Sequence, residues 1–146
     1  MTLLPAFAHS FTGLAARQSQ ASLLATLRYA GAYAITTRQS VQVVVDTTAP
    51  AAYQLFVRRT AAEPWQPLAT RFARRRVLPR GSTLAVADGS GRPLTTPAVT
   101  FYPNGQADPV QLTLSHPDGV TTITVDEATG HVALLPAAKE AYGMAR

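Results

Sequence analysis

The sequence predicts an α+β fold in a single domain, with one long N-terminal helix packed on one or more antiparallel β-sheets of about seven to eight strands. Two observations support this prediction. Apolar residues recur with a helical period through residues 7–39, and short β-branched and aromatic runs separated by turns follow from Val41 onward. A chain of 146 residues is long enough to bury one sizeable core. We therefore expect a helix at residues 1–40, a β-rich globular domain at 41–136 and a tail at 137–146.

The N-terminal segment has the pattern of an amphipathic helix rich in alanine, the residue with the highest helix propensity. Its apolar residues recur at spacings of three, four and seven, which is the period of one helix face: Phe7, Phe11, Leu14, Ala21, Leu24, Leu27, Ala34 and Ile35. A helix of about 30 residues is roughly 45 Å long, so one end is expected to project beyond the body. The half from Leu23 to Ile35 is expected to pack on the sheet. The earlier residues have no obvious body to cover and are predicted to form an assembly interface: Leu3, Leu4, Phe7, Phe11 and Leu14.

The β-rich part contains a first hairpin, a weakly patterned middle and a clear C-terminal meander. Two β-branched and aromatic runs flank a short turn near Pro50, which indicates the hairpin. The last third alternates with period two between turns, which indicates the meander. The predicted strands lie at 41–45, 53–57, 83–87, 99–102, 110–114, 120–125 and 132–135. Within 60–80, Pro64 and Pro67 exclude a central strand, and 72–78 is either an edge strand or a loop.

The residues that usually carry catalysis or bind metals are few and scattered. The chain has no cysteine, which excludes disulfides, thiolate metal sites and a cysteine nucleophile. His9, His116 and His131 lack the spacing of metal ligands, and the acidic residues lie mostly in turns, where turn chemistry explains them. No nucleotide-binding or nucleophile motif occurs. We therefore expect no catalytic residue, no metal and no cofactor, and a hydrolase has only the acidic turns in its favour.

An arginine cluster is the most pointed chemical feature of a chain whose formal net charge is +5. The cluster consists of Arg71, Arg74, Arg75, Arg76 and Arg80, with Trp65 nearby. The sequence favours first a solvated edge strand whose charges prevent edge pairing. A basic face for an acidic partner subunit comes second, and nucleic-acid binding through arginine forks and aromatic stacking comes third.

Six short stretches, in this order along the chain, resemble the minor pseudopilins of the GspH/FimT family, which occur in type II secretion systems and type IV pili. The first resembles the end of the family's hydrophobic helix, the next two its LxxLRxARxxAIxR stretch, and the last three its LPxGxxL, FxPxG and TGRV motifs. They are Leu4–Phe7, Leu24–Ala30, Ala34–Arg38, Leu78–Leu84, Phe101–Gly105 and Thr129–Val132. The resemblance implies a pilin-like fold and covers nearly the whole chain.

The chain also departs from the family pattern in two places. The family's processing signal, a glycine followed by Phe-Thr-Leu-x-Glu and about 20 apolar residues, does not occur, so the resemblance implies the soluble part of a longer precursor. In the family that segment anchors the precursor in the inner membrane and is the site of processing and methylation. The arginine of the closing motif is His131 here, which argues against carrying over DNA binding of the FimT kind.

The function implied by the resemblance is structural. The chain is expected to be a minor pseudopilin near the tip of a periplasmic pseudopilus, in contact with other minor pseudopilins and with the major pseudopilin. Its helix would supply the filament core, and its β domain would supply specific contacts. The alternative is a type IV pilus minor pilin that binds DNA through the arginine cluster, Arg71–Arg80.

Overall fold

The computed structural model describes residues 3–48, 50–117 and 119–135, with side chains from Leu14 onward except that of Phe72. Helix α1 (Leu3–Thr37) comes first, and a short 3-10 helix, η1 (Arg71–Ala73), lies between the third and fourth strands. Within the described ranges there are nine strands: β1 (Ser40–Asp46), β2 (Ala52–Arg58), β3 (Gln66–Pro67), β4 (Arg76–Val77), β5 (Thr83–Asp88), β6 (Ala98–Phe101), β7 (Val110–His116), β8 (Gly119–Val125) and β9 (Val132–Leu134).

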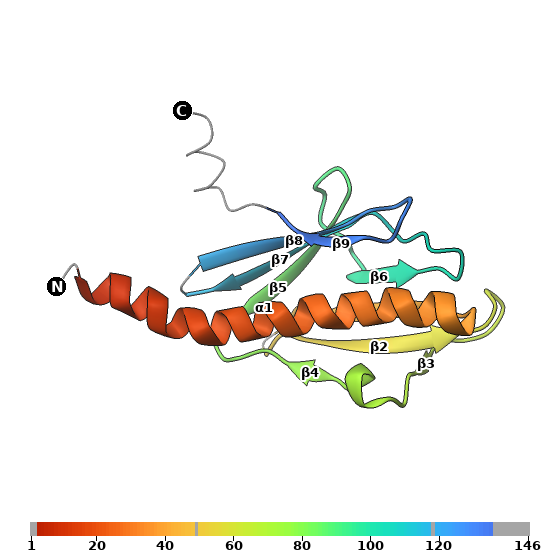
Figure 1. Cartoon of the computed structure of the whole chain (residues 1–146), viewed down its shortest axis with the longest axis horizontal. Coiled ribbons are helices and arrows are strands. Elements are labelled where there is room, and N and C mark those ends of the chain that lie inside the picture. Colours follow the sequence, from red (N-terminus) through yellow and green to blue (C-terminus); the bar gives the residue numbers. More distant parts are fainter. Residues whose placement is uncertain (1–2, 49, 118, 136–146) are drawn as a thin grey trace.

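The strands form two antiparallel sheets (Figure 1). The first sheet has the order β3-β2-β1-β6, with β4 also paired to β2, and the second has the order β5-β7-β8-β9. The predicted hairpin is confirmed as β1 and β2, which pair from Ser40↔Arg58 to Asp46↔Ala52. The predicted meander is confirmed as β7, β8 and β9.

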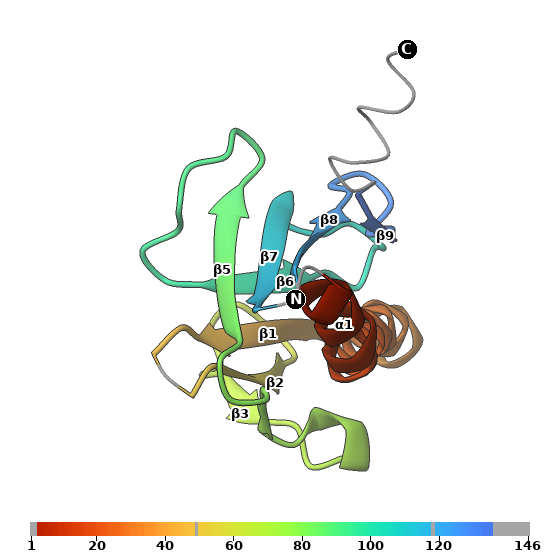
Figure 2. The same ribbon diagram turned by 90° about the vertical axis from the view of Figure 1, so that its left-hand side faces the viewer.

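Helix α1 packs against both sheets and completes one core. Viewed nearly along the helix, Figure 2 shows α1 beside β1 and β2 and below β8 and β9. The helix buries Leu23, Leu27, Ala30 and Ala34, and β1 buries every second residue from Val41. Figure 1 shows the N-terminal turns of α1 extending past the strands, as the predicted helix length implied.

The helix ends without a glycine. Arg38 has a φ of 58°, in the left-handed region, and the amide of Gln39 donates to the carbonyl oxygen of Ala34 at 3.2 Å. This six-to-one hydrogen bond around a left-handed residue is the Schellman motif. The left-handed position of that motif is usually glycine, and here it is Arg38. It turns the chain directly into β1, three residues after Thr37.

Two predictions about packing and strand number are corrected by the structure. Ala21 and Ile35 were placed on the same face as Leu27 and Ala34, but both are exposed, Ile35 by 54%. The reason is that a 3.6-residue period carries them round to the opposite side of the helix. The strand count exceeds seven to eight because residues 60–80 contribute β3 and β4, two-residue pairings on the outer edge of β2.

Single buried residues hold the 60–80 segment on the body. Leu68, Ala73 and Leu78 are buried, one each near β3, η1 and β4. The structure thus combines the two alternatives for 72–78, because η1 is followed by a short edge strand.

Among the described residues no helix is long and apolar enough to cross a membrane. The tail predicted for residues 137–146 lies outside the described ranges.

Candidate assembly surface

Helix α1 presents a continuous exposed stripe opposite its buried face. The stripe consists of the small and aliphatic side chains Leu14, Ala21, Ala25, Ala32 and Ile35, and the exposed Arg17 and Arg28 lie between them on the same side of the helix. At about 100° per residue these positions fall within about 60° of one direction. Leu14 and Ile35, near its ends, are 57% and 54% exposed. We call this set the helix stripe, and alanines in it leave room for another backbone to approach closely.

A shallow groove of about 230 Å³ opens beside the helix stripe. Arg28, Ala32 and Ile35 form its helical wall, and the turns 101–106 and 129–131 form the other. Four of the stretches that carry the family resemblance contribute to these walls. The amide of Ala107 donates to the carbonyl oxygen of Glu127 at 3.0 Å and ties the two turns together. The groove therefore has a fixed outline next to the helix stripe.

Polar contacts hold the helix in one orientation on the sheets. Arg28 Nη2 donates to the carbonyl oxygen of Val132 at 3.2 Å, which satisfies an acceptor on β9. The Thr121 hydroxyl donates to Gln20 Oε1 at 2.9 Å, and Tyr29 donates to Thr70 Oγ1 at 3.1 Å. These contacts are spread from Gln20 to Tyr29, so the helix stripe is presented rigidly.

A further contact of this kind involves the buried Tyr53 on β2. Burial raises the pKa of its hydroxyl, and a hydrogen bond with Thr26 and the charge of Arg76 oppose that rise. Thr26 is itself buried in the helix face that meets the sheet. This pair adds a polar tie between α1 and the first sheet.

The predicted interface residues of the helix stay a prediction. For Leu3, Leu4, Phe7 and Phe11 the structure describes the helical backbone alone, so their role stays a prediction. Leu14 is exposed on the helix stripe, and its interface role also stays a prediction. Sequence reasoning missed Ala21, Ala25, Ala32 and Ile35 as members of this surface. Alanines carry little hydrophobic signal, although their spacing alone would have revealed the second face.

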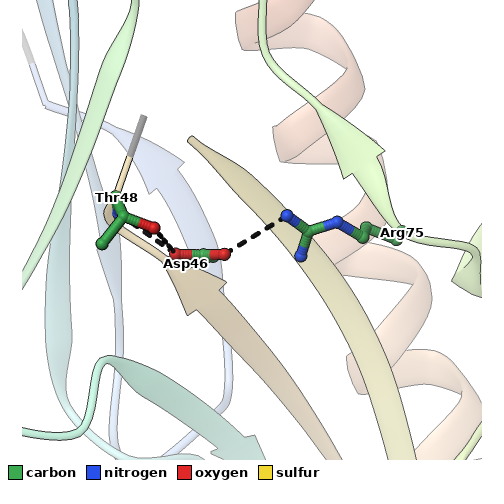
Figure 3. A network of polar contacts seen from close by, with 3 residues as sticks. All are labelled: Asp46, Thr48 and Arg75. Atoms are coloured by element: carbon green, nitrogen blue, oxygen red, sulfur yellow. Dashed lines mark hydrogen bonds and ion pairs between the residues drawn. The ribbon is translucent and has the colours of Figure 1, made fainter. Parts of the chain in front are cut away.

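The arginine cluster does not form one surface. Arg75 pairs with Asp46 at the end of β1, with Nη2 3.2 Å from Oδ2 (Figure 3). Arg76 lies opposite Tyr53 on the side of the sheet that faces the helix, and its buried Nε has no hydrogen-bond partner. The remaining members are exposed on the surface: Arg71, Arg74 and Arg80. A solvated edge, the first of the predicted alternatives, matches the short pairing of β4 on β2.

A second cationic feature was not predicted. Arg58, the last residue of β2, places its guanidinium carbon 4.2 Å from the centre of the Trp65 ring. Tyr102 is close by: burial raises the pKa of its hydroxyl, the hydrogen bond to Asp108 and that residue's charge raise it further, and the charge of Arg58 opposes the rise. The pairing depends on how the 59–64 loop returns to the sheet, for which the sequence gives no signal.

The carboxylates of the described residues stabilise turns and do not form a reactive pair. Asp46, Asp88 and Asp126 have lowered pKa values, chiefly because the hydroxyls of Thr48, Ser90 and Thr129 donate to them. Backbone amides of the same turns lower these pKa values further. Across the described ranges, no three His, Asp or Glu side chains gather closely enough to hold a metal ion.

Comparison with known proteins gives one family match and several fold matches. The sequence model of the family described as type II transport protein GspH matches residues 20–129. The minor pseudopilin EpsH from the type 2 secretion system of Vibrio cholerae is 20% identical, with a TM-score of 0.71 over 85% of this chain and 97% of that chain. The type IV minor pilin FimU of Pseudomonas aeruginosa strain PAO1 is 21% identical, with a TM-score of 0.61 over 86% and 92%. At these identities the structural matches establish the fold alone. A search of curated protein sequences finds no match.

Proposed function

This chain belongs to the GspH family of type II transport proteins, and on that premise we propose that it is a minor pseudopilin of a type II secretion system. In this role it is a structural subunit and not an enzyme. It assembles with other minor pseudopilins and with the major pseudopilin, at or near the tip of the periplasmic pseudopilus. The full-length precursor is anchored in the inner membrane.

The observation that carries this proposal is the helix stripe. A helix that served only its own domain would bury one face and cover the other with charged side chains. Here the outward face carries Leu14, three alanines and Ile35, and only two charged side chains, Arg17 and Arg28, lie among them. Leu14 and Ile35 are each a little over half exposed, so burying the rest of each side chain against a neighbouring helix would contribute about 0.8–1.5 kcal/mol. Such a face is what a subunit packed among other helices requires.

The groove beside the stripe supplies a means of choosing the neighbour. Its walls are positioned by backbone hydrogen bonds, such as that from Gly130 to the carbonyl oxygen of Asp126 at 2.8 Å. A side chain projecting from a neighbouring helix fits between Ala32 and the two turns. The helix stripe therefore provides contact area, and the groove provides selectivity between similar subunits.

The direct test places a charge on the stripe. Ala25→Glu puts a carboxylate in the middle of the exposed face, three residues before Arg28, where assembly would remove it from water. The matched control is Ala85→Glu, the same substitution at an exposed position of β5. Leu24 is unsuitable for this purpose because it packs partly against the core.

Co-purification with the other minor pseudopilins of the same secretion system is the measurement. We expect Ala25→Glu to abolish co-purification and Ala85→Glu to retain it, with both variants showing the circular dichroism of the parent. Complex formation that survives Ala25→Glu undiminished would contradict the proposed role of the stripe.

A type IV minor pilin that binds DNA is a second candidate, supported by three exposed arginines near η1 and β4. Within the described residues, the Arg75–Asp46 contact is the one ion pair, so Arg71, Arg74 and Arg80 carry uncompensated charge. The test is a gel shift at low salt with the triple variant Arg71→Ala/Arg74→Ala/Arg80→Ala. DNA binding that falls with salt, and whose salt dependence becomes shallower in the variant, supports this candidate. Absence of a shift removes it.

A further inference from the structure

Trp65 holds the guanidinium of Arg58 in a fixed position. The guanidinium carbon lies 4.2 Å from the centre of the indole ring, a cation–π contact. Nη1 also points to the carbonyl oxygen of Ala61 at 3.5 Å, a long contact. An arginine held in this way has lost most of its side-chain freedom before any partner arrives, so a partner need not pay for that ordering.

The Arg58–Trp65 pair lies on the face of the first sheet that points away from the helix. Successive side chains of a strand point to opposite faces of the sheet. Val41 is buried, so Ser40 beside it points outward, and Arg58 points the same way because it pairs with Ser40. Figure 1 shows the end of β2 and the start of β3 at the opposite end of the molecule from the N-terminus. This surface is therefore on the other side of the first sheet from α1, although the C-terminal end of α1 lies at the same end of the molecule.

The carboxylates near Arg58 bind other groups and leave its guanidinium without an ion-pair partner in the described part of the chain. Glu63 Oε1 accepts from the backbone amide of Arg59 at 3.1 Å. Asp108 accepts from Tyr102 and from the amide of Thr100 at 2.9 Å and 3.2 Å. Neither forms an ion pair with Arg58 in the described part of the chain. An open hollow of about 470 Å³ lies alongside, lined by Arg58, Arg59, Glu63, Pro64 and Gln66 among others.

We propose that the Arg58–Trp65 pair is an anchor for one carboxylate side chain of a partner protein. The planar guanidinium offers two parallel N–H donors that match a carboxylate. The hollow beside it has room for the residues that flank the acidic one, with Gln66 and the backbone of the 59–64 loop at its wall. The partner is a protein segment that presents an isolated Asp or Glu.

The local charge balance favours a single carboxylate over a nucleic acid. The two arginines, Arg58 and Arg59, stand beside two carboxylates, Glu63 and Asp108. A nucleic-acid backbone carries closely spaced negative charges and needs an excess of cations. A single carboxylate bound to one guanidinium group does not need an excess of cations. The arginines with uncompensated charge lie elsewhere, on η1 and near β4.

Nuclear magnetic resonance titration of the full chain tests this proposal, because it detects weak binding at named residues. The probe is the capped peptide Ala-Glu-Ala, and the matched control peptide is Ala-Gln-Ala. Trp65 is the single tryptophan, so its indole N–H signal reports this site without ambiguity. We expect saturable shifts at Trp65 and residues 58–66 with the Glu peptide, and at least five-fold weaker binding of the Gln peptide.

Two variants separate a specific fork from a general positive surface. Arg58→Lys keeps the charge and the aromatic contact but loses the bidentate fork, and should weaken binding of the Glu peptide at least five-fold. Arg92→Lys, at an exposed arginine in the loop after β5, should leave it unchanged. Equal affinity in Arg58→Lys, or equal shifts with both peptides, would overturn the proposal.

A titration with an oligothymidylate tests whether the same site binds nucleic acid instead. Stronger shifts at Trp65 with the oligonucleotide than with the Glu peptide would replace the proposal with nucleic-acid binding. None of these titrations requires another pseudopilin or the helix stripe. The carboxylate anchor can therefore fail while the proposed assembly role stands, and the reverse also holds.

Discussion

The ring of Phe101 lies directly against the backbone of Gly31: a Cβ atom added to Gly31 would be 3.3 Å from Cδ2 of that ring. Glycine in a helix normally costs about 1 kcal/mol relative to alanine. Phe101 is fully buried on β6, and its ring would have to shift by a few tenths of an ångström to admit the new methyl group. We therefore expect Gly31→Ala to lower the free energy of unfolding, by about 1 kcal/mol, in spite of the gain in helix propensity.

Urea unfolding monitored by circular dichroism measures this effect. The control is the same substitution in a Phe101→Leu background, where the smaller side chain frees the contact. There, Gly31→Ala should become neutral or stabilising, and the coupling between the two positions should be about 1 kcal/mol. If Gly31→Ala stabilises the parent chain, the Phe101 ring moves away from the added methyl group at little cost, and the prediction is wrong.

Gly31 also illustrates what the sequence reveals about the fold. In the sequence it is a weak point of a helical pattern, whereas in the structure it is a place where the Phe101 ring of β6 packs on the helix. The helix, the β1–β2 hairpin and the meander were predictable because each depends on local periodicity and turn residues. The pairing of β6 with β1, through Val41↔Phe101, is a long-range choice between similar strands.

The candidate surfaces were less predictable than the fold, for identifiable reasons. Helical periodicity predicted an apolar helix but not which apolar residues face the sheets, so Ile35 was assigned to the wrong side. The arginine cluster was visible as a run, yet strand alternation sends Arg75 and Arg76 to different sides of the sheet. The contact of Arg58 with Trp65 arises from the path of a loop.

Arg38 provides a way to raise the stability of the chain. Its φ of 58° is a conformation that costs a residue with a Cβ roughly 1–2 kcal/mol, and that glycine adopts freely. Part of the gain is offset because glycine makes the unfolded chain more flexible. Arg38→Gly should therefore raise the free energy of unfolding by about 0.5–1 kcal/mol. Arg38→Ala, which retains the Cβ, should not, and an equal gain in both variants would attribute the effect to the charge.

Leu27 and Leu14 form a matched pair for testing which helix face is structural. Leu27 is fully buried, and Leu27→Ala should cost about 2–5 kcal/mol because it leaves a cavity between the helix and the sheets. Leu14 is 57% exposed, and Leu14→Ala should change stability by less than about 0.5 kcal/mol. Thermal unfolding of the isolated chain measures both. A large loss in Leu14→Ala would place that residue in the core and remove it from the helix stripe.

Asp126 makes the stability of the β8–β9 turn dependent on pH. The hydroxyl and the amide of Thr129 both donate to its carboxylate, and they hold its pKa below the ordinary value of 3.8. A group whose pKa is lowered by folding contributes stability that is fully present above its unfolded pKa and is lost as pH falls through its folded pKa. The free energy of unfolding should therefore decrease on acidification below about pH 4.

Asp126→Asn should be less stable than the parent at about pH 6. The difference should vanish at low pH, because a protonated Asp126 no longer offers a charged acceptor to Thr129. Glu127→Gln removes the neighbouring charge and leaves the hydrogen bonds of Asp126 in place. A parallel loss of pH dependence in that control would assign the effect to net charge.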